Sequence, residues 1–178
     1  MDIIALFLQA VWFILPAYFA NSSPVLGHRL FEKYNLPVDF GKKLKDGRRI
    51  FGDGKTWNGL VFGIFVAVLV GYAQGIFQTA YGLNGFLPMS IQLAFLLGFG
   101  ALTGDLIKSF FKRRRGYERG KSWFPLDQID FILGAFLFSL ILAPFNWKYF
   151  VILLVITPAI HWAANFIGFK LKLKKEPW

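Results

Sequence analysis

Five long apolar segments, separated by basic stretches, limit what this chain can fold into. They run over Ile3–Ala20, Gly59–Thr79, Ser90–Phe111, Ile129–Phe145 and Tyr149–Lys170. Each is close to the roughly 20 residues that an α-helix needs to cross the core of a bilayer. The chain is 56% hydrophobic, whereas soluble domains are about 45–50% apolar. The pattern predicts an all-α, polytopic integral membrane protein with five transmembrane helices, in a single domain over residues 1–178.

The positive charges lie almost entirely at one end of these segments. Of the 20 Lys and Arg residues, only Lys148 falls between segments at the other end. The positive-inside rule therefore predicts a cell-membrane protein with its N-terminus outside and its C-terminus in the cytoplasm. A net charge of +10 is also typical of nucleic-acid binding. Because the charges alternate with apolar segments, we favour cytoplasmic loops and expect no nucleic-acid partner.

A cluster of polar residues follows the third apolar segment. Asp105, Lys108, Ser109 and Lys112 are spaced at i, i+3, i+4 and i+7, so they share one face if the helix continues. Ionisable groups at membrane depth are costly and usually functional. The alternative is a solvated helix end, at which the long side chains of Lys108 and Lys112 extend into water.

Two further acids, Asp127 and Asp130, begin the fourth segment. Either can cap the helix, and acids favour the first turn. Capping needs only one of them, and with Asp105 they form a set of three carboxylates. Mg²⁺ prefers oxygen ligands from a few carboxylates together with substrate phosphates. The sequence therefore predicts a polar, cytoplasm-facing cavity with a Mg²⁺ site. The chain has no Cys, so a thiolate site is excluded.

Two loop motifs suggest contacts to a nucleotide. The stretch Gly52–Thr56 resembles the end of a P-loop, but Arg49 stands where the first glycine belongs. Its glycine N–H groups, Lys55 and the following helix start still favour a phosphate. Alternatively, this is a flexible loop in which Thr56 caps the second segment. The element Asn21-Ser22-Ser23-Pro24 either binds a base or sugar or is a simple helix exit.

Together these elements resemble a known family. The motifs around Asp105, Lys112-Arg113 and Asp127-Gln128-Ile129-Asp130 are similar to the signature of membrane CTP-phosphatidate cytidylyltransferases. A His-Gly-Gly insert and a Lys-Asp pair are missing, and Gln128 stands where Arg is usual. These departures resemble the archaeal branch, the CDP-archaeol synthases. That branch also carries elements similar to Asn21–Pro24 and Phe51–Gly59.

The resemblance implies a Mg²⁺-dependent nucleotidyltransferase at the cytoplasmic face of the membrane. An isoprenoid ether-lipid phosphate, 2,3-di-O-geranylgeranylglyceryl phosphate, would react with CTP to give CDP-archaeol and pyrophosphate. Asp105, Asp127 and Asp130 would hold Mg²⁺ and, with Lys112, form the catalytic set. The expected CTP-binding residues are Asn21, Ser22, Ser23, Pro24, Lys55, Thr56, Lys112 and Arg113.

Two alternatives remain open. The same chemistry on a diacyl substrate would make the protein a CDP-diacylglycerol synthase acting on phosphatidate. A different class would be a small membrane transporter or nucleotide-binding protein. Carriers place their sites near mid-membrane, whereas the polar motifs here all lie at one end of the segments, which favours the enzyme.

Overall fold

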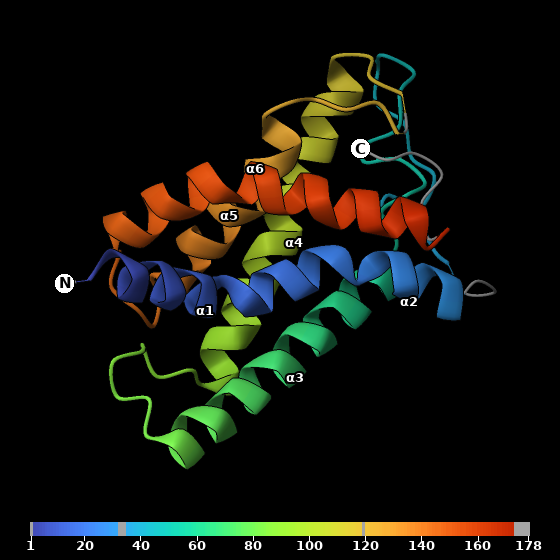
Figure 1. Ribbon diagram of the computed structural model, residues 1–178. Coiled ribbons are helices and arrows are strands. Elements are labelled where there is room, and N and C mark those ends of the chain that lie inside the picture. The colour runs from blue at the N-terminus through green and yellow to red at the C-terminus, as the bar shows by residue number, and fades with distance from the viewer. Residues whose placement is uncertain (1, 32–34, 119, 173–178) are drawn as a thin grey trace.

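The computed structural model describes residues 2–31, 35–118 and 120–172. Within these residues every regular element is a helix, and only isolated β-bridges join parts of the loop before α3. Figure 1 shows the arrangement. The helices are α1 (Ile3–Ser22), α2 (Pro24–Leu30), α3 (Trp57–Tyr81), α4 (Ile91–Arg114), α5 (Leu126–Ser139) and α6 (Trp147–Lys170).

Within the described part of the chain, four helical segments are long and apolar enough to cross a membrane. They are Ile3–His28, which joins α1 to most of α2, and the helices α3, α4 and α6, with 24 to 26 residues each. The fourth expected segment, Ile129–Phe145, corresponds to α5, which has only 14 residues and is about 21 Å long at a rise of about 1.5 Å per residue. The chain turns after it, where Ser139 O accepts from Leu142 N at 3.0 Å and Ala143 N at 2.8 Å. Five spans therefore stay a prediction.

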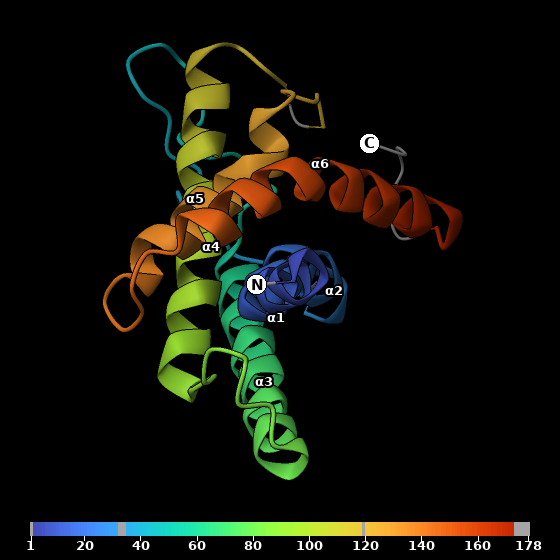
Figure 2. The same cartoon turned by 60° about the vertical axis from the view of Figure 1, so that its left-hand side comes forward.

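Helix α4 lies at the centre of the bundle and packs on α1, α3 and α5. Figure 2 shows α1 nearly end-on, with α3 and α6 on either side of it. The side chain of Tyr18 in α1 is hydrogen-bonded to Thr157 in α6, with 2.6 Å between their oxygens. The fully buried side chains include Ile14, Leu97, Phe131, Ile132 and Leu153. The core thus draws on α1, α4, α5 and α6.

The backbones of α4 and α5 touch through glycines. A Cβ atom added to Gly134 would overlap the carbonyl oxygen of Gly100, and one added to Gly104 would overlap that of Asp130. Small residues permit this close approach of membrane helices. The contact fixes the start of α5 against the polar end of α4.

The opposite end of the bundle has its own polar contacts. Gln9 Nε2 donates to Gly85 O at 2.7 Å, and Tyr149 OH donates to Gln9 Oε1 at 3.2 Å. These bonds join the start of α1, the α3–α4 connection and the start of α6.

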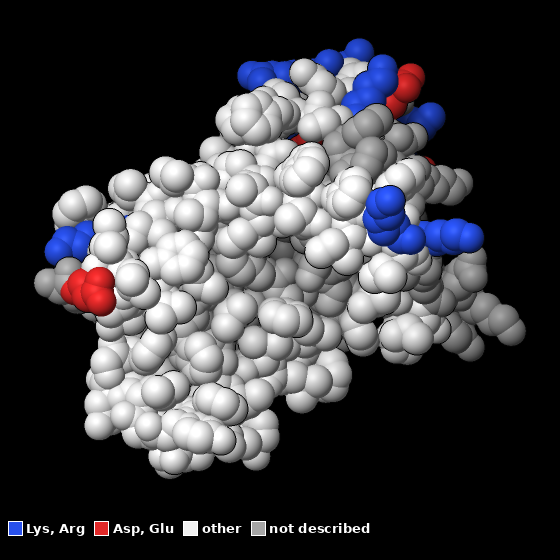
Figure 3. Space-filling view, viewed as in Figure 1, with Lys and Arg blue, Asp and Glu red and all other residues white. Residues whose placement is uncertain are grey.

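Charges are unevenly distributed over the surface. Figure 3 shows Lys and Arg gathered mainly at one end of the molecule, above a broad uncharged face. Large apolar side chains are exposed along the helices, with Val61, Leu137 and Val155 each more than 60% exposed. Such a surface is suited to lipid rather than water.

Candidate functional site

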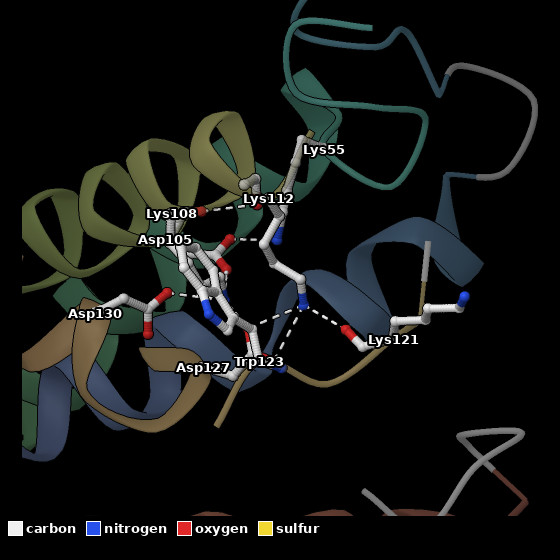
Figure 4. Close-up of polar contacts among 9 residues, drawn as sticks. Lys55, Asp105, Lys108, Lys112, Lys121, Trp123, Asp127 and Asp130 are labelled. Atoms are coloured by element: carbon white, nitrogen blue, oxygen red, sulfur yellow. Dashed lines mark hydrogen bonds and ion pairs between the residues drawn. The ribbon is translucent and has the colours of Figure 1, made fainter. Parts of the chain in front are cut away.

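Three carboxylates surround the ammonium group of Lys108 (Figure 4). Lys108 Nζ lies 3.0 Å from Asp105 Oδ1, 3.1 Å from Asp127 Oδ1 and 2.9 Å from Asp130 Oδ2. Asp105 and Lys108 are one turn apart in α4, while Asp127 and Asp130 lie in the first turns of α5. The structure therefore brings together the three acids that the sequence singled out.

Two more lysines complete this aspartate–lysine cluster. Lys55, from the loop before α3, forms an ion pair with Asp105. Lys112 Nζ lies 3.1 Å from both carboxylate oxygens of Asp127 and also donates to the carbonyl of Lys121. Three carboxylates thus face three ammonium groups, so the formal charges of the cluster cancel.

Asp130 is the most buried member, with a side chain only 6% exposed. Among the described residues, its Oδ1 has no hydrogen-bond partner, and its Oδ2 has only the ion pair with Lys108. A buried carboxylate oxygen without a partner is costly. The pairing of this side chain is incomplete, and a further cation would complete it.

The donor chemistry of the cluster fits Mg²⁺, because carboxylate oxygens are the ligands that this ion prefers and one Asp130 oxygen is unpaired. In the described part of the chain, however, no three His, Cys, Asp or Glu side chains are already spaced as a metal-ligand set. The Lys108 ammonium group occupies the middle of the three acids. A metal held by all three would therefore require Lys108 to move.

A cavity of about 710 Å³ opens beside the cluster, within the size range of ligand sites. Its lining comes from α2, the loop before α3, the end of α4 and the loop after it. Lys55, Lys108, Lys112 and Arg113 all line it. Arg113 Nε is buried and has no hydrogen-bond partner in the described residues. Cationic groups therefore dominate the wall nearest the carboxylates.

Thr56 is not among the residues that line this cavity. It is buried, and its Oγ1 accepts from Gly59 N at 3.2 Å, which caps α3. The sequence allowed Thr56 to be either a phosphate ligand or a helix cap. In this structure it is the N-cap of α3.

Three backbone N–H groups of the loop before α3 donate to one carboxylate, that of Asp39. Phe51 N and Gly52 N each donate to Asp39 Oδ2 at 3.0 Å. Gly41 N donates to Asp39 Oδ1 at 3.2 Å, and the Arg49 guanidinium pairs with the same carboxylate. Within the Gly52–Thr56 stretch, the Gly52 N–H is therefore already bound to a side-chain carboxylate. Sequence reasoning missed Asp39, because an acid ten residues before its arginine partner gives no periodic signal.

Asp39 has a fully buried side chain. Burial by itself would raise the pKa of this carboxyl, but hydrogen bonds from Arg49 and from the N–H groups of Gly52, Phe51 and Gly41 hold the pKa well below its usual range. The group is therefore ionised at neutral pH and serves as a fixed negative charge inside the loop.

The hydroxyls of the Asn21–Pro24 element bond within the helix. Ser22 Oγ donates to Tyr18 O at 3.0 Å, and Ser23 Oγ donates to Ala20 O at 3.2 Å. Pro24 begins α2, and Asn21 is half-buried. The cavity lining includes the next residue, Val25, but none of these four. In this structure, Asn21–Pro24 is the junction at which α1 ends and α2 begins, beside the cavity.

A second set of contacts fastens the loop before α3 to the end of α4. Arg114 NH1 donates to Asp46 Oδ1 at 2.8 Å, and Arg48 NH1 donates to Arg114 O at 2.8 Å. From the sequence alone, these arginines indicate only which side of the membrane the loops face. Their contacts hold the loop over the cavity.

The bilayer-length helices and the charged cluster at one end define a multi-pass membrane protein with a polar site. The CarS-like CDP-archaeol synthase family model matches residues 3–178. Named CDP-archaeol synthases from Pyrococcus abyssi and Pyrobaculum aerophilum are 48% identical over 171 residues and 44% identical over 178 residues. The first alignment covers 96% of this chain and 97% of the relative, and the second covers all of both.

A solved structure of an intramembrane enzyme for archaeal membrane lipids biosynthesis is also similar. It is 36% identical, with a TM-score of 0.76, and the match covers 89% of this chain and 94% of that one. This chain therefore belongs to the CDP-archaeol synthase family, which confirms the resemblance seen in its sequence.

Proposed function

We propose that this protein transfers a cytidylyl group from CTP to 2,3-di-O-geranylgeranylglyceryl phosphate, making CDP-archaeol and pyrophosphate. The observation that carries the proposal is the charge-balanced aspartate–lysine cluster beside a cation-lined cavity, in a chain of this family. A triphosphate can take over the lysines, which frees the carboxylates for a metal.

The reaction brings two phosphate-bearing anions together. An oxygen of the lipid phosphate attacks the α-phosphorus of CTP, and the bond to the pyrophosphate oxygen breaks. Lys55, Lys112 and Arg113 line the cavity and would reduce the repulsion and stabilise charge on the phosphoryl oxygens. The protein acts by positioning and electrostatics and needs no nucleophile of its own.

Asp105, Asp127 and Asp130 are the residues that would hold Mg²⁺. When bound, the ion would neutralise phosphate charge and stabilise the leaving oxygens. Lys108 then has to leave its position among the carboxylates. Its long side chain borders the cavity, so a phosphate oxygen would be an alternative partner.

We further propose five membrane passes, an N-terminus outside and an active site facing the cytoplasm. The contacts among Gln9, Gly85 and Tyr149 lie at one end of the bundle, and the aspartate–lysine cluster lies at the other. The chain must return between these ends after α4, and α5 with the turn after it is the segment available. The concentration of Lys and Arg at the cluster end supports a cytoplasmic orientation.

The test is pyrophosphate release by the purified protein in detergent. It should require CTP, the geranylgeranyl ether-lipid phosphate and Mg²⁺ together. Release with phosphatidate but not with the ether lipid would support the CDP-diacylglycerol alternative. Tight CTP binding without turnover of either lipid would contradict the enzymatic proposal and favour a nucleotide-binding or transport role.

A further inference from the structure

A continuous path of hydrogen bonds leads from the buried Asp39 to Lys55. Asp39 Oδ2 accepts from Gly52 N at 3.0 Å. Gly52 O accepts from Lys55 N at 3.2 Å, and Lys55 O accepts from Val38 N at 2.8 Å. The Lys55 backbone is thus held on both sides by residues that border or bond to Asp39.

The loop before α3 depends on the Asp39 carboxylate because the loop backbone folds around this side chain. Gly41 and Gly52 have φ angles of +80° and +97°, a region that favours glycine. Their N–H groups, with that of Phe51, converge on one side chain. Without an acceptor at this point, several N–H groups and the Arg49 guanidinium would lose their partner.

We propose that Asp39 is a positioning residue that presents Lys55 to the substrate phosphates. Its carboxylate takes the place of a bound anion, so the loop is folded before CTP arrives and holds Lys55 at the cavity wall. The inference rests on the proposed function, because it assigns Lys55 to CTP.

Asp39→Asn replaces one acceptor oxygen by an NH₂ donor facing other donors. We expect the KM for CTP to rise about tenfold, as for loss of a charge-assisted contact, while the KM for the lipid phosphate stays unchanged. Asp2→Asn, the same chemical change at the N-cap of α1 and at the opposite end of the bundle, is the control. Asp2 is exposed, and an amide oxygen at this position can still accept from Ile4 N, as Asp2 Oδ1 does at 3.1 Å. We expect its KM for CTP to change less than about twofold.

A double-mutant cycle separates positioning from general loss of fold. If Asp39 acts through Lys55, then Asp39→Asn adds little to the loss of kcat/KM for CTP already caused by Lys55→Met. Fully additive losses, or an equal rise of both KM values in Asp39→Asn, would overturn the proposal.

Chemical rescue provides a second measurement if Asp39→Asn folds poorly. Asp39→Gly removes the carboxylate and leaves space for a small anion. Added formate should restore the KM for CTP, and chloride at the same ionic strength should not. Failure of formate to improve CTP binding would contradict the proposal. Activity of the unmodified protein tests the proposed function separately, because it does not depend on the outcome for these variants.

Discussion

Lys108 Nζ lies 2.9 Å from Asp130 Oδ2, while Asp130 Oδ1, buried beside it, has no hydrogen-bond partner among the described residues. One ammonium group is thus shared by three carboxylates, and the most buried of them is incompletely paired. The formal charges of this cluster cancel without a ligand, and they no longer cancel when either a metal or a triphosphate binds alone. Binding of both together restores the charge balance, and the predictions on this site rest on that.

The first prediction concerns Asp130. Asp130→Asn should lower kcat by about a hundredfold or more, as for loss of a group that stabilises charge in the transition state. The thermal midpoint should fall, because Lys108 loses one of its buried carboxylate partners and the cluster is left with an excess positive charge. Pyrophosphate release and thermal unfolding in detergent measure the two effects. Asp2→Asn, at the N-cap of α1, is the matched control, and near-normal turnover by Asp130→Asn would refute the metal assignment.

The second prediction concerns Lys108. Lys108→Met leaves three carboxylates with two lysines, so the thermal midpoint without metal should fall by on the order of 5 °C. Mg²⁺ or Mn²⁺ without nucleotide should raise the midpoint more in this variant than in the unmodified protein. Lys148→Met, at the other end of the bundle, should change neither quantity. An unchanged metal response in Lys108→Met would show that Lys108 does not compete with the metal.

The third prediction concerns the glycine contact between α4 and α5. Gly104→Ala forces a methyl group against the carbonyl of Asp130, so the helices must separate at a cost of about 1–3 kcal/mol. We expect both a lower thermal midpoint and lower activity, because Asp130 shifts with its backbone. In Gly85→Ala the new Cβ meets only Gln9 Nε2 at 3.7 Å, so this control should behave normally.

The fourth prediction distinguishes a helix cap from a phosphate ligand at Thr56. Thr56→Ala should destabilise the protein by about 1 kcal/mol and leave the KM for CTP unchanged once folding is accounted for. Thr56→Ser should restore the stability, because its hydroxyl can accept from Gly59 N. A selective rise in the KM for CTP in Thr56→Ala would mean that this hydroxyl contacts the nucleotide.

The fifth prediction is a pH dependence. Because the folded pKa of Asp39 lies below its usual range, its contribution to stability is complete above the unfolded value of about 3.9 and is lost as the pH falls towards the folded pKa. The difference in thermal midpoint between the unmodified protein and Asp39→Asn should therefore be constant from about pH 8 to about pH 5 and shrink below about pH 4. A difference that shrinks as the pH rises would contradict this assignment.

Much of the helical fold could be predicted from the sequence. Four of the five apolar segments became helices of bilayer length, and the starts at Thr56 and Ser90 are capped as their residue types suggest. The fourth segment, Ile129–Phe145, was predicted to continue beyond the end of its helix, because a continuous apolar sequence does not reveal that the chain turns after Ser139. Hydrophobicity indicates which residues avoid water, and both a helix and an apolar turn can contain such residues.

For the site, the sequence singled out the carboxylates of Asp105, Asp127 and Asp130, and their metal role stays a prediction. It did not reveal Lys108 as their shared partner, nor Asp39 as the anion within the loop. Both depend on contacts between segments or across an irregular loop, where no residue period constrains the geometry.

By itself, then, the sequence determined a membrane-embedded helical chain of the CDP-archaeol synthase family with its charges at one end, because apolar length, charge distribution and motif spacing are properties of the linear chain. Only the tertiary structure decided which cation faces which carboxylate. Those pairs form because α4 and α5 approach closely enough at Gly104 and Gly134, and because one loop folds around Asp39.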